Sequence, residues 1–70
     1  MKYIIEVYKR EDKNSNYELK SSKEIDACSN LIVKNKIRNE YYIYDEIMHH
    51  DNTETLFCTD NLTKIRLIKK

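Results

Sequence analysis

Two adjacent histidines followed by an acid, His49, His50 and Asp51, and two cysteines, Cys28 and Cys58, are the side chains best suited to metal binding or catalysis. A zinc site needs about three or four converging ligands. Neighbouring residues of a strand point to opposite faces of a sheet, so His49 and His50 could not readily share one metal ion. We therefore predict no metal site, no cofactor and no catalytic residue. The rival hypothesis is a small nuclease or hydrolase that uses His49 or His50.

The two cysteines indicate a cytoplasmic protein with buried thiols rather than a disulfide scaffold. Small secreted domains usually carry about two to four disulfides, and this chain has only Cys28 and Cys58. Cys28 follows the apolar pattern of a predicted helix, and Cys58 alternates with Leu56 in a predicted strand. Buried thiols of this kind are usually inert, so we expect neither to be a nucleophile.

Composition places the chain among small folded proteins and excludes several functions. Its 70 residues allow one domain, residues 1–70, and 40% of them are hydrophobic. The absence of Gly excludes Gly-rich phosphate loops, and turns must be made by Asn, Asp and Ser. The formal net charge of +1 favours neither nucleic acid nor an acidic partner. No apolar run approaches the roughly 20 residues of a membrane span, so no membrane association is expected.

The first half of the chain predicts a hairpin and a helix. Residues 2–9 alternate apolar and polar side chains, and residues 17–20 resume that alternation after a polar turn. Ser21 and Glu24 match a capping box, which predicts a helix over residues 22–36. Its apolar stripe would consist of Ile25, Cys28, Leu31 and Ile32.

The second half predicts a three-stranded meander with two-residue turns at Asp51-Asn52 and Asp60-Asn61. In that register Ile47 pairs with Leu56 and Asp45 with Cys58, while Leu56 pairs with Ile65 and Glu54 with Leu67. The predicted fold is α+β, in the order ββαβββ, with one helix packed on one face of a mainly antiparallel sheet. The core is expected to contain Tyr3, Ile5, Val7, Leu19, Ile25, Cys28, Leu31, Ile32, Ile47, Leu56, Cys58, Ile65 and Leu67.

One helix covers only one face of a sheet, so the other face is the expected binding surface. Residues 39–63 contain six acids and no Lys or Arg. In the predicted register, tyrosines of this segment share the uncovered face with a methionine and a phenylalanine, a composition typical of protein interfaces. We expect a protein partner with a basic surface, or a homodimer, bound by the anchors Tyr42, Tyr44, Met48 and Phe57 and the acidic rim Asp45, Glu46 and Glu54.

Nucleic acid is the alternative partner. Bases could stack on the exposed aromatic rings, and the basic end of the chain could contact phosphates. The basic residues that would contact phosphates are Arg38, Lys64, Arg66, Lys69 and Lys70. Acidic flanks around the aromatic residues favour the protein partner. Simple neutralisation of acidic strands by neighbouring basic strands also remains open, as it would give the same charge pattern without any partner.

The chain opens with MKYIIEVYKRED and is rich in Lys, Asn, Ile and Tyr throughout. In these features it resembles small accessory proteins of phages of low-GC Gram-positive bacteria. The resemblance extends to no diagnostic motif and transfers no functional residue. It implies a small host-takeover protein, often a dimer, that binds one host protein and inhibits or redirects it without catalysis.

Overall fold

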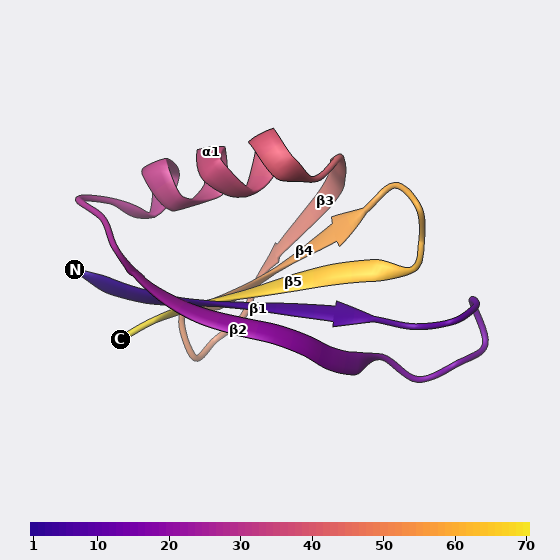
Figure 1. Cartoon of the computed structure of the whole chain (residues 1–70). Coiled ribbons are helices and arrows are strands. Elements are labelled where there is room, and N and C mark those ends of the chain that lie inside the picture. The colour runs from indigo at the N-terminus through magenta and orange to yellow at the C-terminus, as the bar shows by residue number, and fades with distance from the viewer.

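Five antiparallel strands and one helix form the structure, a computed structural model that describes residues 1–70 (Figure 1). The strand order in the single sheet is β2-β1-β5-β4-β3, and α1 lies along one face of it. This confirms the predicted α+β fold in the order ββαβββ. The elements are β1 (Lys2–Lys9), β2 (Glu18–Asp26), α1 (Asn30–Glu40), β3 (Ile43–Met48), β4 (Thr53–Cys58) and β5 (Thr63–Lys69).

The core lies between α1 and the sheet. Strand alternation supplies most of it, because every second residue of the central strands faces the helix. Seven of the predicted core residues are buried, and two helix residues, Val33 and Ile37, complete the layer. The seven confirmed residues are Tyr3, Ile5, Val7, Leu56, Cys58, Ile65 and Leu67.

The predicted helix boundaries are wrong. Ser21 to Asp26 belong to β2, where Ser21 pairs with Val7 and Ile25 with Tyr3. The cap is Ser29, whose hydroxyl accepts a hydrogen bond from the Ile32 N–H at 3.4 Å. A capping box satisfies two backbone donors, whereas pairing with β1 satisfies a ladder of backbone groups along eight residue pairs. The tertiary contact therefore overrides the local helix signal.

The shift of the helix changes its buried face. Leu31 is 62% exposed, Ile32 is also exposed, and Val33 and Ile37, four residues apart, face the sheet instead. Cys28 precedes the helix and is exposed, contrary to the prediction that it is buried. Leu19 and Ile47 are exposed as well, and Ile25 is only partly buried against the core.

The register of the meander is correct for one hairpin and wrong for the other. Leu56 pairs with Ile65 and Glu54 with Leu67, as predicted. However, Leu56 pairs with Glu46 rather than Ile47, and Asp45 pairs with Phe57 rather than Cys58.

A longer turn causes this one-residue shift. His49 N–H donates to the Thr53 carbonyl at 2.8 Å, so the turn contains His50, Asp51 and Asn52. Asn52 adopts a left-handed backbone with φ 66°, and the Asp51 carboxylate accepts hydrogen bonds from the Thr53 N–H and hydroxyl. Because side chains alternate between faces, a shift of one residue moves Glu46 to the helix side and Ile47 to the open side.

Two isoleucines on α1 test which face of the helix is buried. We expect Ile37→Val to lower the free energy of unfolding by about 1 kcal/mol, since it removes a buried methylene. Ile32→Val removes the same group from an exposed site and should cost less than about 0.5 kcal/mol. Urea unfolding of both variants gives the comparison. Equal losses, or a larger loss at Ile32, would contradict the helix orientation.

Candidate functional site

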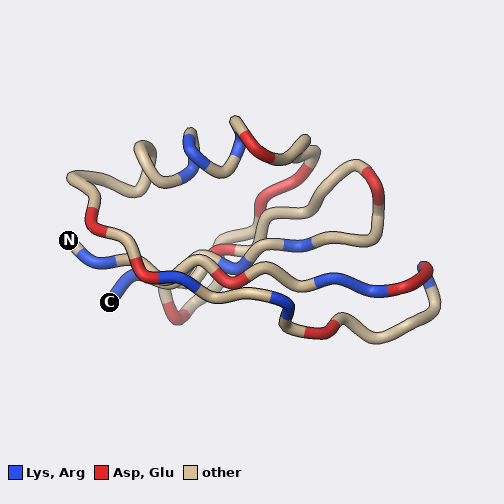
Figure 2. Tube along the Cα trace, viewed as in Figure 1, with Lys and Arg blue, Asp and Glu red and all other residues tan.

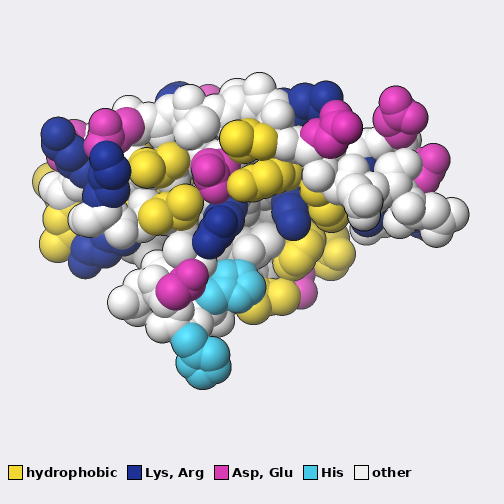
Figure 3. Space-filling view, turned by 90° about the horizontal axis from the view of Figure 1, so that it is seen from below, with side chains coloured by type: hydrophobic (Ala, Val, Ile, Leu, Met, Phe, Trp, Pro, Cys, Tyr) yellow, Lys and Arg dark blue, Asp and Glu magenta, His cyan; other side chains and the backbone are white.

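The face of the sheet opposite α1 is uncovered, and we call it the open face. Alternate residues of all five strands form it, and opposite residues in neighbouring strands define its rows. One row runs across four strands, from Asp45 through Phe57 and Lys64 to Tyr8. Figure 3 views this side and shows hydrophobic side chains in several groups, with charged side chains between them. It is therefore a mixed apolar and charged surface.

The predicted anchors lie on or beside β3 and β4, but the register does not bring all of them to the open face: Phe57 lies in an open-face row, whereas Met48 pairs with Glu54 of the helix side. Tyr42 is 86% exposed, and Tyr44 and Met48 are each 60% exposed. They lie on or next to β3, the edge strand, and Phe57 is half-buried on the adjoining β4. Ile47, predicted to be in the core, adds a further exposed apolar side chain here. The edge of β3 and the open face next to it therefore carry several exposed apolar side chains.

The predicted acidic rim is only partly present. Asp45 is exposed, has no ion-pair partner, and accepts a hydrogen bond from the Glu46 N–H at 2.9 Å. Glu46 and Glu54 instead point toward α1, and Glu54 is only 4% exposed. The prediction that both belong to an exposed rim is therefore wrong. The physical reason is the register, which places Glu54 on the same face as Leu56 and Cys58.

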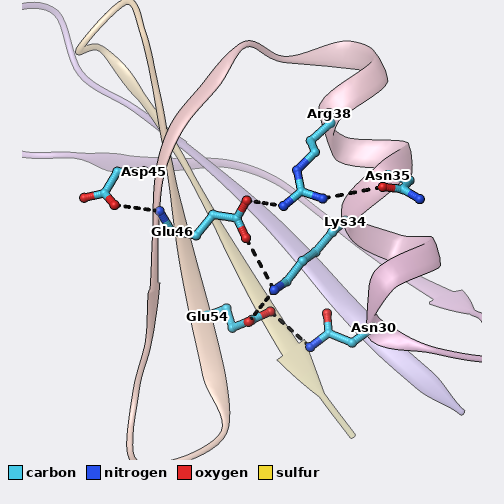
Figure 4. Close-up of polar contacts among 7 residues, drawn as sticks. All are labelled: Asn30, Lys34, Asn35, Arg38, Asp45, Glu46 and Glu54. Atoms are coloured by element: carbon cyan, nitrogen blue, oxygen red, sulfur yellow. Dashed lines mark hydrogen bonds and ion pairs between the residues drawn. The ribbon is translucent and has the colours of Figure 1, made fainter.

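Glu46 and Glu54 belong to an ionic network between α1 and the sheet (Figure 4). Lys34 Nζ lies 2.7 Å from Glu54 Oε1 and 3.3 Å from Glu46 Oε1, and Asn30 Nδ2 donates to Glu54 Oε2 at 3.1 Å. Arg38 pairs with the other carboxylate oxygen of Glu46. The Glu54 hydrogen bond raises the pKa of Lys34, and the Arg38 hydrogen bond lowers the pKa of Glu46. This network attaches α1 to β3 and β4.

Sequence reasoning missed this network, although a signal was present. Glu54 alternates with Leu56 and Cys58 in the core-facing positions of the predicted strand. A carboxylate in such a position needs a cation or hydrogen-bond donors from the covering layer. Lys34, a basic residue within the predicted helix, was a candidate for this cation.

The five basic residues of the nucleic-acid alternative do not form one basic track. Arg38 pairs with Glu46 across the helix–sheet interface. Arg66 lies between Glu6 at 4.0 Å and Asp51 at 3.8 Å, and Lys70 pairs with Glu24 at 3.3 Å. Figure 2 shows basic and acidic positions distributed over the whole chain rather than at opposite ends. The separation of charge along the sequence is therefore largely neutralised in the fold.

Lys69, on the helix side of the sheet, has no carboxylate partner, and the same is true of Lys64 on the open face. The Nζ of Lys64 lies 5.3 Å from the ring centre of Tyr8 and 4.5 Å from that of Tyr17. Both distances are within the range of a cation–π contact. Lys64 is thus a cation held among aromatic rings on the open face.

The residues suited to catalysis are dispersed. His49 Nε2 forms a hydrogen bond with Thr55 Oγ1 at 2.7 Å, and His50 lies in the exposed turn. Burial raises the pKa of the Cys58 thiol, which favours its protonated form at neutral pH. Both cysteines are free, and no three potential ligands lie close enough together to hold a metal ion.

Comparisons with known proteins do not assign a family. No protein-family model, curated protein or solved structure matches this chain significantly. The helix α1 has neither the length nor the apolar character that a membrane span needs.

Removal of the network's central cation should strongly destabilise the fold. Lys34→Met leaves Glu54 buried without a cation, and we expect a loss of about 3–5 kcal/mol in the free energy of unfolding. Addition of Glu54→Leu to this variant should restore at least half of the loss, because the buried charge is then absent. Lys36→Met on the exposed side of α1 is the matched control, measured by the same urea unfolding. A loss from Lys34→Met no larger than that from Lys36→Met would contradict the network's role.

The lowered pKa of Glu46 predicts an acid-sensitive stability. A carboxyl group whose pKa is lower in the folded state stabilises the protein above its unfolded pKa, here the ordinary value of 4.5. This stabilisation is lost as the pH falls through the folded-state pKa. We expect the urea midpoint to fall between about pH 6 and pH 3, and to fall less steeply in Glu46→Gln. Glu40→Gln, at an exposed helix position without an ion pair, should leave the wild-type slope unchanged; an unchanged slope in Glu46→Gln would refute the assignment.

Proposed function

We propose that this protein is a small non-catalytic binding module that recognises another protein through the open face and the β3 edge. The observation that carries the proposal is the group of exposed apolar side chains, Tyr42, Tyr44, Ile47 and Met48, next to Phe57. Exposed apolar regions of this kind are characteristic of interaction surfaces. Tyr, Phe and Met are also enriched at the centres of protein interfaces.

The arrangement of these residues supports direct binding rather than a structural role. The ionic network and the pair Val33 and Ile37 position α1 on the opposite side of the sheet, so the helix cannot cover the open face. Aromatic side chains on strands are already restricted in their rotamers and lose little entropy when a partner covers them. Asp45 is the one acid of the predicted rim that remains exposed, so we expect a partner with a Lys or Arg opposite it.

A nucleic-acid partner is the second candidate, and the position of Lys64 favours it. A cation beside Tyr8 and Tyr17 on a sheet face suits the backbone and bases of a single strand. Against it, the cations Arg38, Arg66 and Lys70 are each paired with an acid. Electrophoretic shift with single-stranded DNA and RNA separates the two, because phosphate-driven binding weakens steeply with salt.

The resemblance to phage accessory proteins adds a biological setting to the proposal. In that setting the protein acts in the cytoplasm of the host cell. Its partner is then one host protein that it inhibits or redirects by covering a functional surface. Pull-down with the tagged protein from such a cell, followed by mass spectrometry, would identify the partner.

Truncation of two anchors tests the proposed surface. Each of Tyr44→Ala and Phe57→Ala should cost about 2 kcal/mol or more of binding free energy, since aromatic anchors dominate interface energetics. Calorimetry with the identified partner measures the loss, and circular dichroism checks that the variants are folded.

The matched control removes two exposed apolar side chains from the outer face of α1, Leu31→Ala with Ile32→Ala. This control should bind as the wild type does. If the Tyr44→Ala, Phe57→Ala variant is folded and also binds as the wild type does, the proposed surface does not bind the partner.

A further inference from the structure

Two unpaired charges flank a phenylalanine in one row of the open face. Asp45 on β3 is opposite Phe57 on β4, and Phe57 is opposite Lys64 on β5. Asp45 accepts one hydrogen bond, from the Glu46 N–H, and no cation pairs with it. Lys64 lies over the rings of Tyr8 and Tyr17, and no carboxylate pairs with it. An acid and a base therefore lie on the same face, two strands apart, each without an ionic partner.

This row is complementary to itself. Neighbouring strands are about 4.8 Å apart, so Asp45 and Lys64 lie about equally far from β4 on its two sides. A two-fold axis along β4, passing beside Phe57, would place Asp45 of one copy opposite Lys64 of the other, and the reverse. Two sheets pack face to face at about 10 Å, a distance that side chains of these lengths can bridge.

We propose that the open face binds a second copy of this chain in a symmetric, face-to-face dimer, with Phe57 at the two-fold axis and two Asp45–Lys64 pairs between copies. The inference rests on the proposed function, since it names the partner of that same surface. The two Phe57 rings would meet at the axis, and Ile47 of each copy would lie opposite the apolar stem of Arg66 of the other. The ion pairs would select this alignment of the two sheets.

Other symmetric arrangements are disfavoured by the same charges. An axis along β5 would place Lys64 opposite Lys64 of the second copy. Antiparallel edge-to-edge pairing of β3 centred on Asp45 would place Asp45 opposite Asp45 of the second copy, and like charges directly opposite are destabilising. In addition, the Glu46 N–H already donates a hydrogen bond to the Asp45 carboxylate, so this donor is not free for a pairing strand.

A charge exchange tests the proposal. Sedimentation equilibrium over about 1 µM to 1 mM should show a monomer–dimer equilibrium of the wild type. Asp45→Lys and Lys64→Asp should each raise the dissociation constant at least about tenfold, because each substitution creates like-charge contacts twice in a symmetric dimer. The double variant Asp45→Lys, Lys64→Asp should return it to within about threefold of the wild type, because both pairs are restored in reverse.

Lys69→Asp on the same strand is the matched control, since Lys69 pairs with Tyr3 and so belongs to the helix side of the sheet. It should leave the dissociation constant unchanged. A wild type that remains monomeric at the highest concentration, or a double variant that is not rescued, would overturn the proposed dimer.

The outcome also separates this inference from the proposed function. If the wild type is monomeric but the Tyr44→Ala, Phe57→Ala variant loses binding to another protein or to single-stranded nucleic acid, the dimer is wrong. The open face is then still a binding surface. If the wild type is monomeric and that variant loses no binding, the dimer and the binding surface are both wrong.

Discussion

The buried carboxylate of Glu54 is the constraint on which the rest of the structure depends. It lies on the core side of β4, where a charge is costly unless it is paired and hydrogen-bonded. Lys34 and Asn30 provide the cation and the amide donor, and both belong to α1. The helix must therefore lie over β3 and β4 with Asn30 and Lys34 facing the sheet. Glu46 and Arg38 extend the same constraint by one more helical turn.

This polar attachment compensates for a helix that contributes little apolar area. Only Val33 and Ile37 of α1 are buried, against seven core residues from the strands. A buried ion pair by itself is a weak source of stability, but it specifies one arrangement because a misplaced helix would leave Glu54 unpaired. We infer that apolar contacts supply most of the stability, and that the network selects the position of the helix.

The position of the helix and one turn together decide which surface remains free. Asn52 and Asn61 adopt left-handed backbone conformations, with φ 66° and 61°, in a chain that contains no Gly. The turn at His50 to Asn52 sets the pairing of β3 with β4 and so turns Glu46 inward and Ile47 outward. The charge and apolar character of the candidate binding surface thus depend on a single residue of turn length. The dimer and the wider binding role remain proposals built on that surface.

The sequence by itself determined the class of fold, the strands β1, β4 and β5, and seven buried residues, because period-two alternation is a local property that each strand carries alone. It also placed exposed tyrosines beside β3. The tertiary structure decided where the helix begins, since β1 has two edges and its pairing with Ser21 to Asp26 outweighs their local preference for a helical cap. The tertiary structure likewise decided which acidic residues are exposed and which are buried in ion pairs. Whether Glu54 forms an exposed rim or a buried ion pair depends on what covers its face of the sheet, and that cover comes from Lys34, twenty residues earlier in the chain.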